Sequence, residues 1–290
     1  MDSTDALIEQ RDRERLEAAR LRAILLQFLF AMPWWLLILI LLGLQVVVLI
    51  LTDDTYGDIF RQLQDGVSMT LFVSFSAYGL SLVIGLLVGL ARVNPPRPLP
   101  SYTGIGALVG LLKVVIFNLA TLYVEILRGL PILVVLLIVA FVVVPLVGEA
   151  LGVQIRGSSP PSAIIALALA YGAFLSETFR AGIQSIGRGQ LEAARSLGMT
   201  YIQAMQHVVL PQAVRVILPP LGNDLIAMIK DSALVAILGI RDITQLAKLS
   251  SGQSFLYLQT YLIAAVIYLS MTIVGSLLVR VLERKVRLGV

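Results

Sequence analysis

Long apolar blocks separated by short polar segments make up most of this chain of 290 residues. Most of these blocks are long enough to cross a bilayer as single helices, which need about 20 residues. We therefore expect an all-α polytopic membrane protein with about six transmembrane helices. The expected spans are residues 23–51, 66–91, 132–147, 162–183, 214–238 and 255–279.

Composition supports a membrane protein and orients it. Of all residues, 58% are hydrophobic and 14% are charged, and soluble domains carry more charge and less apolar content. The net charge of +4 does not suggest a nucleic-acid partner. Basic residues concentrate in short loops and at the C-terminus, as in cytoplasmic segments, so both termini are expected in the cytoplasm. The segments 52–65, 148–161 and 239–254 are then outer loops, and 92–100 is an inner turn.

Residues 102–127 form the one apolar stretch whose topology is ambiguous. Lys113, Asn118, Glu125 and Arg128 argue against a lipid-facing span, since each charge at the bilayer midplane costs about 3 kcal/mol. We interpret the stretch as a partly buried or interfacial helix on the cytoplasmic side, with the next span opening at Pro131. Counting it as a further span would place the polar segment at 187–212 outside the cell.

Segment 187–212 is the longest polar island within the apolar part of the chain. The pattern predicts a helix over 190–197 and a second short helix over 201–207, joined by Gly198 as a left-handed cap. Thr200 is expected to cap the second helix, and Pro211 to end it. Pro219-Pro220 is expected to break the span that follows.

This segment carries a specific signature. Glu192-Ala193-Ala194 is followed by Gly198 and then by Val208-x-Leu210-Pro211. This spacing resembles the EAA loop of ABC-importer permeases, with valine at 208 where isoleucine is commoner. In that family the loop is a coupling helix that inserts into a groove on a cytoplasmic ATPase. The alternative is an ordinary amphipathic loop helix. The resemblance implies ATPase-coupling roles for Glu192, Ala193, Ala194, Gly198, Leu210 and Pro211.

Three further stretches, 123–131, 171–183 and 219–234, resemble permeases of the histidine, glutamine and glutamate uptake type. Departures are Phe174 for a tyrosine, Ala181 for a glycine and Ser232-Ala233 for Thr-Ser. The resemblance covers about residues 66–285 and implies a type I permease core of five spans plus one N-terminal extra. The expected parts are a charged tail at 1–22, an extra helix and outer loop at 23–60, the permease domain at 61–285 and a tail at 286–290.

The sequence offers no convincing covalent chemistry. It has no cysteine and one histidine, His207, and it lacks the Walker A pattern of a nucleotide-binding loop. We therefore expect no catalytic residue, no metal site and no cofactor on this chain, with ATP and Mg²⁺ bound by a partner ATPase.

Ionisable residues inside spans are rare and usually face a bundle interior or an aqueous pathway. Asp224 and Asn223 follow the two prolines, and Asp231 lies two turns on. We expect a substrate pathway at these three residues and at Glu177, because a carboxylate suits an ammonium group. A local ion pair is the alternative for Lys230 and Asp231. Glu125 with Arg128, and Glu177 with Arg180, are spaced for structural pairs near a cytoplasmic gate.

Helix contacts and partners complete the expectations. Gly79, Gly85 and Gly89 would let another helix approach closely; the alternative is a helix that simply tolerates lipid. The resemblance implies a bacterial inner-membrane complex working by alternating access: an ATPase dimer, a second permease subunit, a periplasmic or lipid-anchored amino-acid-binding protein, and surrounding lipid. A permease for another solute such as methionine, or an intramembrane enzyme or channel, are the competing hypotheses.

Overall fold

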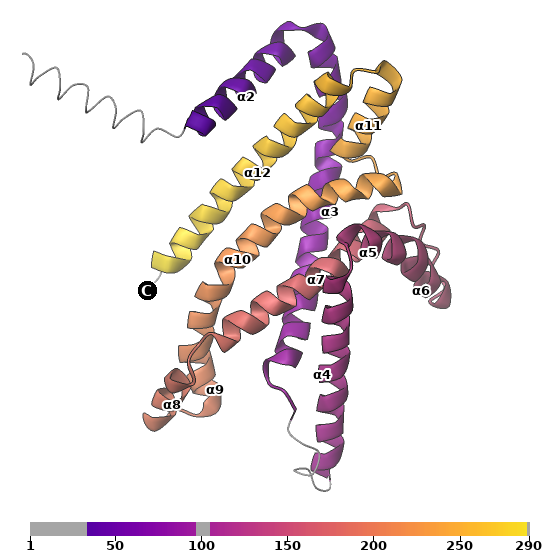
Figure 1. The fold of residues 1–290 in the computed structure, drawn as a ribbon. Helices are drawn as coiled ribbons and strands as arrows, with labels where there is room; N and C mark the ends of the chain where they lie inside the picture. The colour runs from indigo at the N-terminus through magenta and orange to yellow at the C-terminus, as the bar shows by residue number, and fades with distance from the viewer. Residues whose placement is uncertain (1–33, 97–104, 289–290) are drawn as a thin grey trace, which may run out of the picture. The chain divides into compact units, whose positions relative to one another are not determined.

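The structure, a computed structural model, describes residues 34–96 and 105–288, and within these ranges every regular element is a helix (Figure 1). The chain divides into two units, residues 1–54 and 55–290. In the first unit, α2 (Trp34–Thr52) is apolar almost throughout. It covers the later part of the first predicted span, whereas residues 23–33 and the charged tail at 1–22 lie outside the described residues.

Helix α3 (Asp54–Val93) begins well before the span predicted at 66–91. The polar segment 52–65, expected to be a loop, is therefore mostly helical, and that prediction was wrong. Ile59 and Leu63 are buried one turn apart and extend the buried stripe of the span toward the N-terminus. Asp58 and Arg61 pair on the exposed face at 2.7 Å, which makes a polar sequence compatible with a helix.

After α4 (Ile105–Gly129) the chain turns at Pro131 into a continuous helical stretch. This stretch consists of α5 (Ile132–Ile138), a π-helical turn (Val139–Val143) and α6 (Val144–Ala150). The helix predicted at 132–147 is thus confirmed and runs three residues further. Helix α7 (Pro160–Gln184) matches the helix predicted at 162–183.

Helices α3 and α7 run parallel and touch backbone to backbone. A Cβ placed on Gly85 would lie 2.7 Å from Leu175 Cβ, and one on Gly89 would lie 2.8 Å from the carbonyl oxygen of Ser176. Small residues at this four-residue spacing allow such close approach. A Cβ on Gly79 would meet no atom within 4 Å, so the predicted close approach of a helix is confirmed at two of the three glycines.

The polar segment folds as α8 (Arg188–Ser196), α9 (Tyr201–Ala204) and a π-helical turn (Met205–Val209) that passes directly into α10 (Leu210–Asp231). The expectation that Pro211 ends a helix was wrong, because proline is tolerated in a first helical turn, where its N–H is not needed. The expected break at Pro219-Pro220 is also absent, since α10 continues through both prolines. Membrane helices tolerate proline where neighbours satisfy the freed backbone groups.

A 3₁₀ turn (Ser232–Leu238) ends this helix, and α11 (Ile243–Ser254) and α12 (Tyr257–Leu288) follow. In the second unit, α10 packs between α7 and α12, α4 packs on α7, and α11 packs on α12 (Figure 1). The buried centre is formed by apolar residues of α3, α5, α7 and α10. The tail predicted at 286–290 is helical up to Leu288, and the last two residues lie outside the described part.

Five described helices are long and apolar enough to cross a membrane: α3, α4, the stretch Ile132–Ala150, α7 and α12. The apolar part of α2, Leu37–Thr52, is shorter. Helix α10 falls outside this group, because Arg215, Asp224, Lys230 and Asp231 interrupt its apolar sequence. The chain is an all-α, multi-pass membrane protein, as predicted.

Candidate functional site: a helical elbow and the polar clusters beside it

The elbow between α7 and α10 has the predicted local geometry. Gly198 adopts φ +85° and ends α8, with the N–H of Met199 donating to the carbonyl oxygen of Ala194 at 3.3 Å. Thr200 caps α9 in a reciprocal capping box. Its hydroxyl accepts from the Gln203 N–H, and its own N–H donates to Gln203 Oε1 at 2.9 Å.

The elbow turns apolar side chains outward. Leu197, Ile202 and Tyr201 are 82%, 65% and 51% exposed. Ala194 is buried against the rest of the elbow. The surface is thus a compact polar helix pair with an apolar tip, which suits insertion into a groove of another protein. Five of the six predicted coupling residues are exposed, namely Glu192, Ala193, Gly198, Leu210 and Pro211.

Five charged side chains gather where the C-terminal ends of α3, α4 and α7 meet. Glu177 is at the centre: one oxygen accepts a hydrogen bond from Arg92, and the other accepts from Arg180 at 2.6 Å and 3.0 Å. The predicted pair of Glu177 and Arg180 is confirmed. Glu125 lies 3.9 Å from Arg92, and Arg128 lies 3.9 Å from Glu177. The expected pair of Glu125 with Arg128 is replaced by these contacts between helices.

The charged cluster continues to the backbone end of α3. Arg180 Nη1 donates to Gln184 Oε1 at 2.7 Å, and Gln184 Nε2 donates to the Val93 carbonyl oxygen at 2.8 Å. Arg128 also lies over the ring of Phe174, 5.7 Å from its centroid. Because both oxygens of Glu177 are engaged by arginines, this carboxylate is poorly placed to receive a substrate ammonium group.

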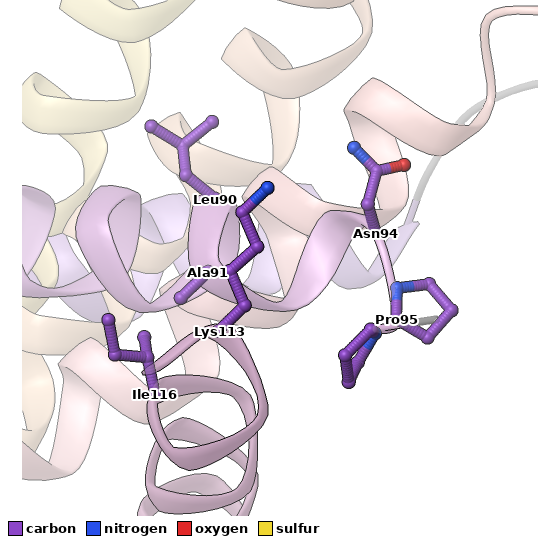
Figure 2. A pocket seen from close by; sticks show the side chains of 7 residues that line it. Leu90, Ala91, Asn94, Pro95, Lys113 and Ile116 are labelled. Atoms are coloured by element: carbon purple, nitrogen blue, oxygen red, sulfur yellow. The ribbon is translucent and has the colours of Figure 1, made fainter. Parts of the chain in front are cut away.

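A hollow of about 510 Å³ lies between the end of α3 and the middle of α4 (Figure 2). Among the described residues that line it, Lys113 of α4 is the only charged one. Its polar companion is Asn94, just beyond α3. Lys113, one of the four polar residues that made the topology of 102–127 ambiguous, thus lies at a hollow with a polar neighbour. The remaining lining residues are Leu90, Ala91, Pro95, Pro96 and Ile116.

A second polar cluster lies where α7 meets the C-terminal end of α10. The buried hydroxyl of Tyr171 donates to Asp231 Oδ2 at 2.6 Å. Lys230 is exposed, and no ion pair joins it to Asp231 in the described part of the chain. Asp231 therefore bonds to Tyr171 of another helix and does not form the local ion pair with Lys230. Tyr171 was visible in the sequence only as part of a motif, without a role.

Asp224 and Asn223 lie in the middle of α10. Asp224 is half-buried and close enough to Tyr78 and Tyr171 to interact with them electrostatically, whereas Asn223 is exposed. The Tyr78 hydroxyl donates to the carbonyl oxygen of Leu221 at 2.6 Å, just after the two prolines. Asp224 and Asp231 therefore share one bundle region, apart from the arginine-rich cluster.

The start of α11 is fixed by a buried carboxyl that the sequence gave no reason to single out. Asp242 is fully buried, accepts from the Gln245 N–H at 2.8 Å and accepts from the Tyr268 hydroxyl at 3.2 Å. Burial raises the pKa of Asp242, and these hydrogen bonds act in the opposite direction. A Cβ on Gly66 of α3 would lie 2.5 Å from the Ile243 nitrogen, so α3 also packs directly against this joint. Among residues 34–96 and 105–288, no cluster of three potential ligands suited to a metal ion occurs.

Comparison with known sequences gives a consistent result. Residues 103–288 match the family described as "Binding-protein-dependent transport system inner membrane component". The chain is 35% identical over 228 residues to the "Probable glutamine ABC transporter permease protein GlnM" of Bacillus subtilis (strain 168), covering 79% of this chain and 94% of that protein. It is also 35% identical over 220 residues to the "Probable amino-acid ABC transporter permease protein YckA" of the same organism, covering 76% and 87%.

Solved structures agree. An amino acid ABC transporter crystallised with histidines matches at 34% identity with a TM-score of 0.64, covering 81% of this chain and 97% of that one. The inward-facing MetNI methionine ABC transporter matches at 22% identity with a TM-score of 0.60, covering 78% and 96%. This second likeness concerns the fold alone.

Proposed function

Because this chain belongs to the family of inner-membrane components of binding-protein-dependent transport systems, we propose that it is the permease subunit of an ATP-driven importer of polar amino acids. The relatives at about a third identity are named for glutamine or amino acids, and the chain covers nearly their whole length. The stretches at 123–131, 171–183 and 219–234 favour this substrate class over methionine.

The observation that carries the proposal is the elbow. Its signature residues fold into α8, a left-handed turn at Gly198 and a capped α9, with an apolar tip exposed. Such a tip suits a groove on an ATPase dimer. ATP and Mg²⁺ are bound by that partner, and this chain itself carries out no covalent chemistry. A second permease subunit and an amino-acid-binding protein complete the importer.

The parallel contact between α3 and α7 supports the proposed orientation. Since these two helices end on the same side, the chain between them crosses the membrane an odd number of times. Helix α4 and the stretch 132–150 therefore make one crossing together. Either of the two could supply this crossing, since both are long and apolar enough to span. From the basic residues near both ends of the sequence, we place the elbow and both termini in the cytoplasm.

We assign the substrate pathway to the polar region of α10, at Asp224, Asn223 and Asp231. A zwitterionic amino acid needs an acceptor for its ammonium group, and two carboxylates face the bundle here. Transport follows alternating access, in which ATP binding biases one of two pre-existing openings. Glu177 we place instead with Glu125, Arg128 and Arg180 in the structural cluster, because arginines occupy both of its oxygens.

A matched pair of glycine variants tests the proposed coupling. A Cβ has free space at both Gly198 and Gly189, but only Gly198 has a positive φ. Gly198→Ala strains the left-handed turn by about 1–2 kcal/mol, whereas Gly189→Ala favours its helix. We expect Gly198→Ala to weaken co-purification of the ATPase and to lower amino-acid uptake, with Gly189→Ala near wild type. Uptake that persists in a strain without the ATPase would refute the proposal.

A further inference from the structure

The contact between α3 and α7 has a regular register along both helices. Gly85 and Gly89, which are one turn apart on α3, pack against α7 at Leu175 and Ser176. One further turn along the same stripe, Arg92 meets Glu177. The glycines bring the backbones together, and the arginine lies where the small-residue contact ends.

Arg92 is almost buried and pairs with carboxylates of two other helices. Its side chain is only 10% exposed, and that of Glu177 is 19% exposed. Removing one partner of a buried ion pair leaves the other charge unpaired, which is strongly destabilising. Arg180 and Gln184 extend the contact to the Val93 carbonyl oxygen, so the last turn of α3 is tied to the last two turns of α7.

The far end of α3 is fixed as well. Gly66 packs against the backbone at Ile243, and the Ile243 N–H donates to the Thr70 hydroxyl at 3.3 Å. Helix α3 has 40 residues and is therefore about 60 Å long. At its C-terminal end, α7 is separated from the elbow helix α8 by only three residues, 185–187. A continuous packed path thus leads from the elbow through α7 and α3 to α11.

We propose that Arg92 is a positioning residue for transport: it clamps α3 to α7, so that movement of the elbow carries both helices as one lever. The proposal rests on the coupling function proposed for the elbow. It assigns a role to a residue outside every motif of the sequence, and it explains why three helices bring opposite charges to one point. A clamp predicts that the gap between the two helix ends does not change during the cycle.

Cysteine cross-linking measures that gap directly, because the chain has no native cysteine. Asn94 of the α3 end and Ile183 of α7 line one hollow of about 400 Å³ beside the elbow, and neither belongs to the clamp. Asn94→Cys with Ile183→Cys is treated with a short bis-maleimide, in the isolated chain and in the complex with its ATPase. The complex is compared without nucleotide and trapped with ATP and vanadate.

With native Arg92 we expect the same cross-linking yield in all three samples. In the Arg92→Gln background we expect the yield to fall about fivefold or more in at least the ATP-trapped complex. The conservative variant Arg92→Lys, which keeps the positive charge beside Glu177 and Glu125, should restore the native pattern. A yield that changes with nucleotide despite native Arg92, or that is unaffected by Arg92→Gln, would overturn the clamp.

Uptake per ATP hydrolysed separates a clamp from a merely structural contact. We expect Arg92→Gln to lose uptake about tenfold while hydrolysis is kept, because the motor still binds the elbow. If Arg92→Gln does not assemble, Glu177→Gln, which removes the same ion pair from the α7 side, carries the same comparison. The proposed function is judged separately, by whether the ATPase co-purifies with the native chain at all.

Discussion

Gly89→Ala tests whether α3 and α7 really depend on backbone contact. The added Cβ would lie 2.8 Å from the carbonyl oxygen of Ser176 and 3.0 Å from Phe179 Cβ, where an ordinary contact is 3.4 Å or more. Neither neighbour is the end of a flexible side chain, so the two helices have to part by about half an ångström. Gly79→Ala on the same helix is the matched control, because a Cβ there meets nothing within 4 Å.

Two opposing effects set the size of the change. Overpacking of this kind costs about 1–3 kcal/mol, and replacing a helical glycine by alanine returns about 1 kcal/mol. Gly89→Ala should therefore be neutral to about 2 kcal/mol destabilising. Gly79→Ala should be stabilising by up to about 1 kcal/mol. The two variants then differ by roughly 1–3 kcal/mol, or roughly 2–12 °C in Tm for a domain of this size.

The assay is thermal unfolding of the purified complex in detergent, followed by uptake in proteoliposomes. We expect the lower Tm for Gly89→Ala, together with weaker coupling, since the clamp at Arg92 is the next contact along the stripe. Equal Tm values for the two alanine variants would refute the close backbone contact. Equal uptake with a lowered Tm would leave the contact but remove its role in coupling.

Two further substitutions probe the buried polar groups. Burial raises the pKa of Asp242 above its ordinary 3.8, so the stability linked to its protonation is present below that pH and lost as pH rises. As the pH rises from 4 to 7, the Tm of wild type should thus fall relative to the Tm of Asp242→Asn. A Tm of wild type that rises relative to that of the variant would contradict this. Tyr171→Phe removes a hydrogen bond to the carboxylate of Asp231, worth about 1.5–3 kcal/mol, and should lower uptake about tenfold or more. The control Tyr123→Phe loses only a hydrogen bond to the Leu169 carbonyl oxygen and should leave uptake near wild type. If both variants lower uptake equally, Asp231 does not belong to the pathway.

The elbow could be predicted because its information is local. The left-handed turn at Gly198 and the cap at Thr200 each depend on residues within one turn, and both occur as expected. Apolar length also predicted the spans at 66–91, 132–147, 162–183 and 255–279. It failed for two helices: α10, expected to span, is not apolar enough, whereas α4, expected to stay on the cytoplasmic side, is long and apolar enough to cross. Local rules also produced the errors: prolines commonly end helices, but Pro211 lies in a first helical turn, and α10 continues through Pro219 and Pro220.

The contacts between helices could not be read from spacing. Glu125 and Arg128 are one turn apart and were expected to pair, but each meets a charge from another helix instead. Arg92 looked like part of a basic turn, and only the close approach at Gly85 and Gly89 brings it to Glu177. Asp242 gave no signal, because its burial depends on α3 and α12, which are distant in the sequence.

The central claim is that the elbow is a handle on the cytoplasmic face, bound by a separate ATPase. Leu197, at its tip, is 82% exposed, and Leu197→Cys would be the only thiol of the chain. Membrane-impermeant maleimide should label it in inside-out vesicles and not in right-side-out ones, and bound ATPase should block the labelling. Labelling from the outside, or equal labelling with and without the ATPase, would contradict the account.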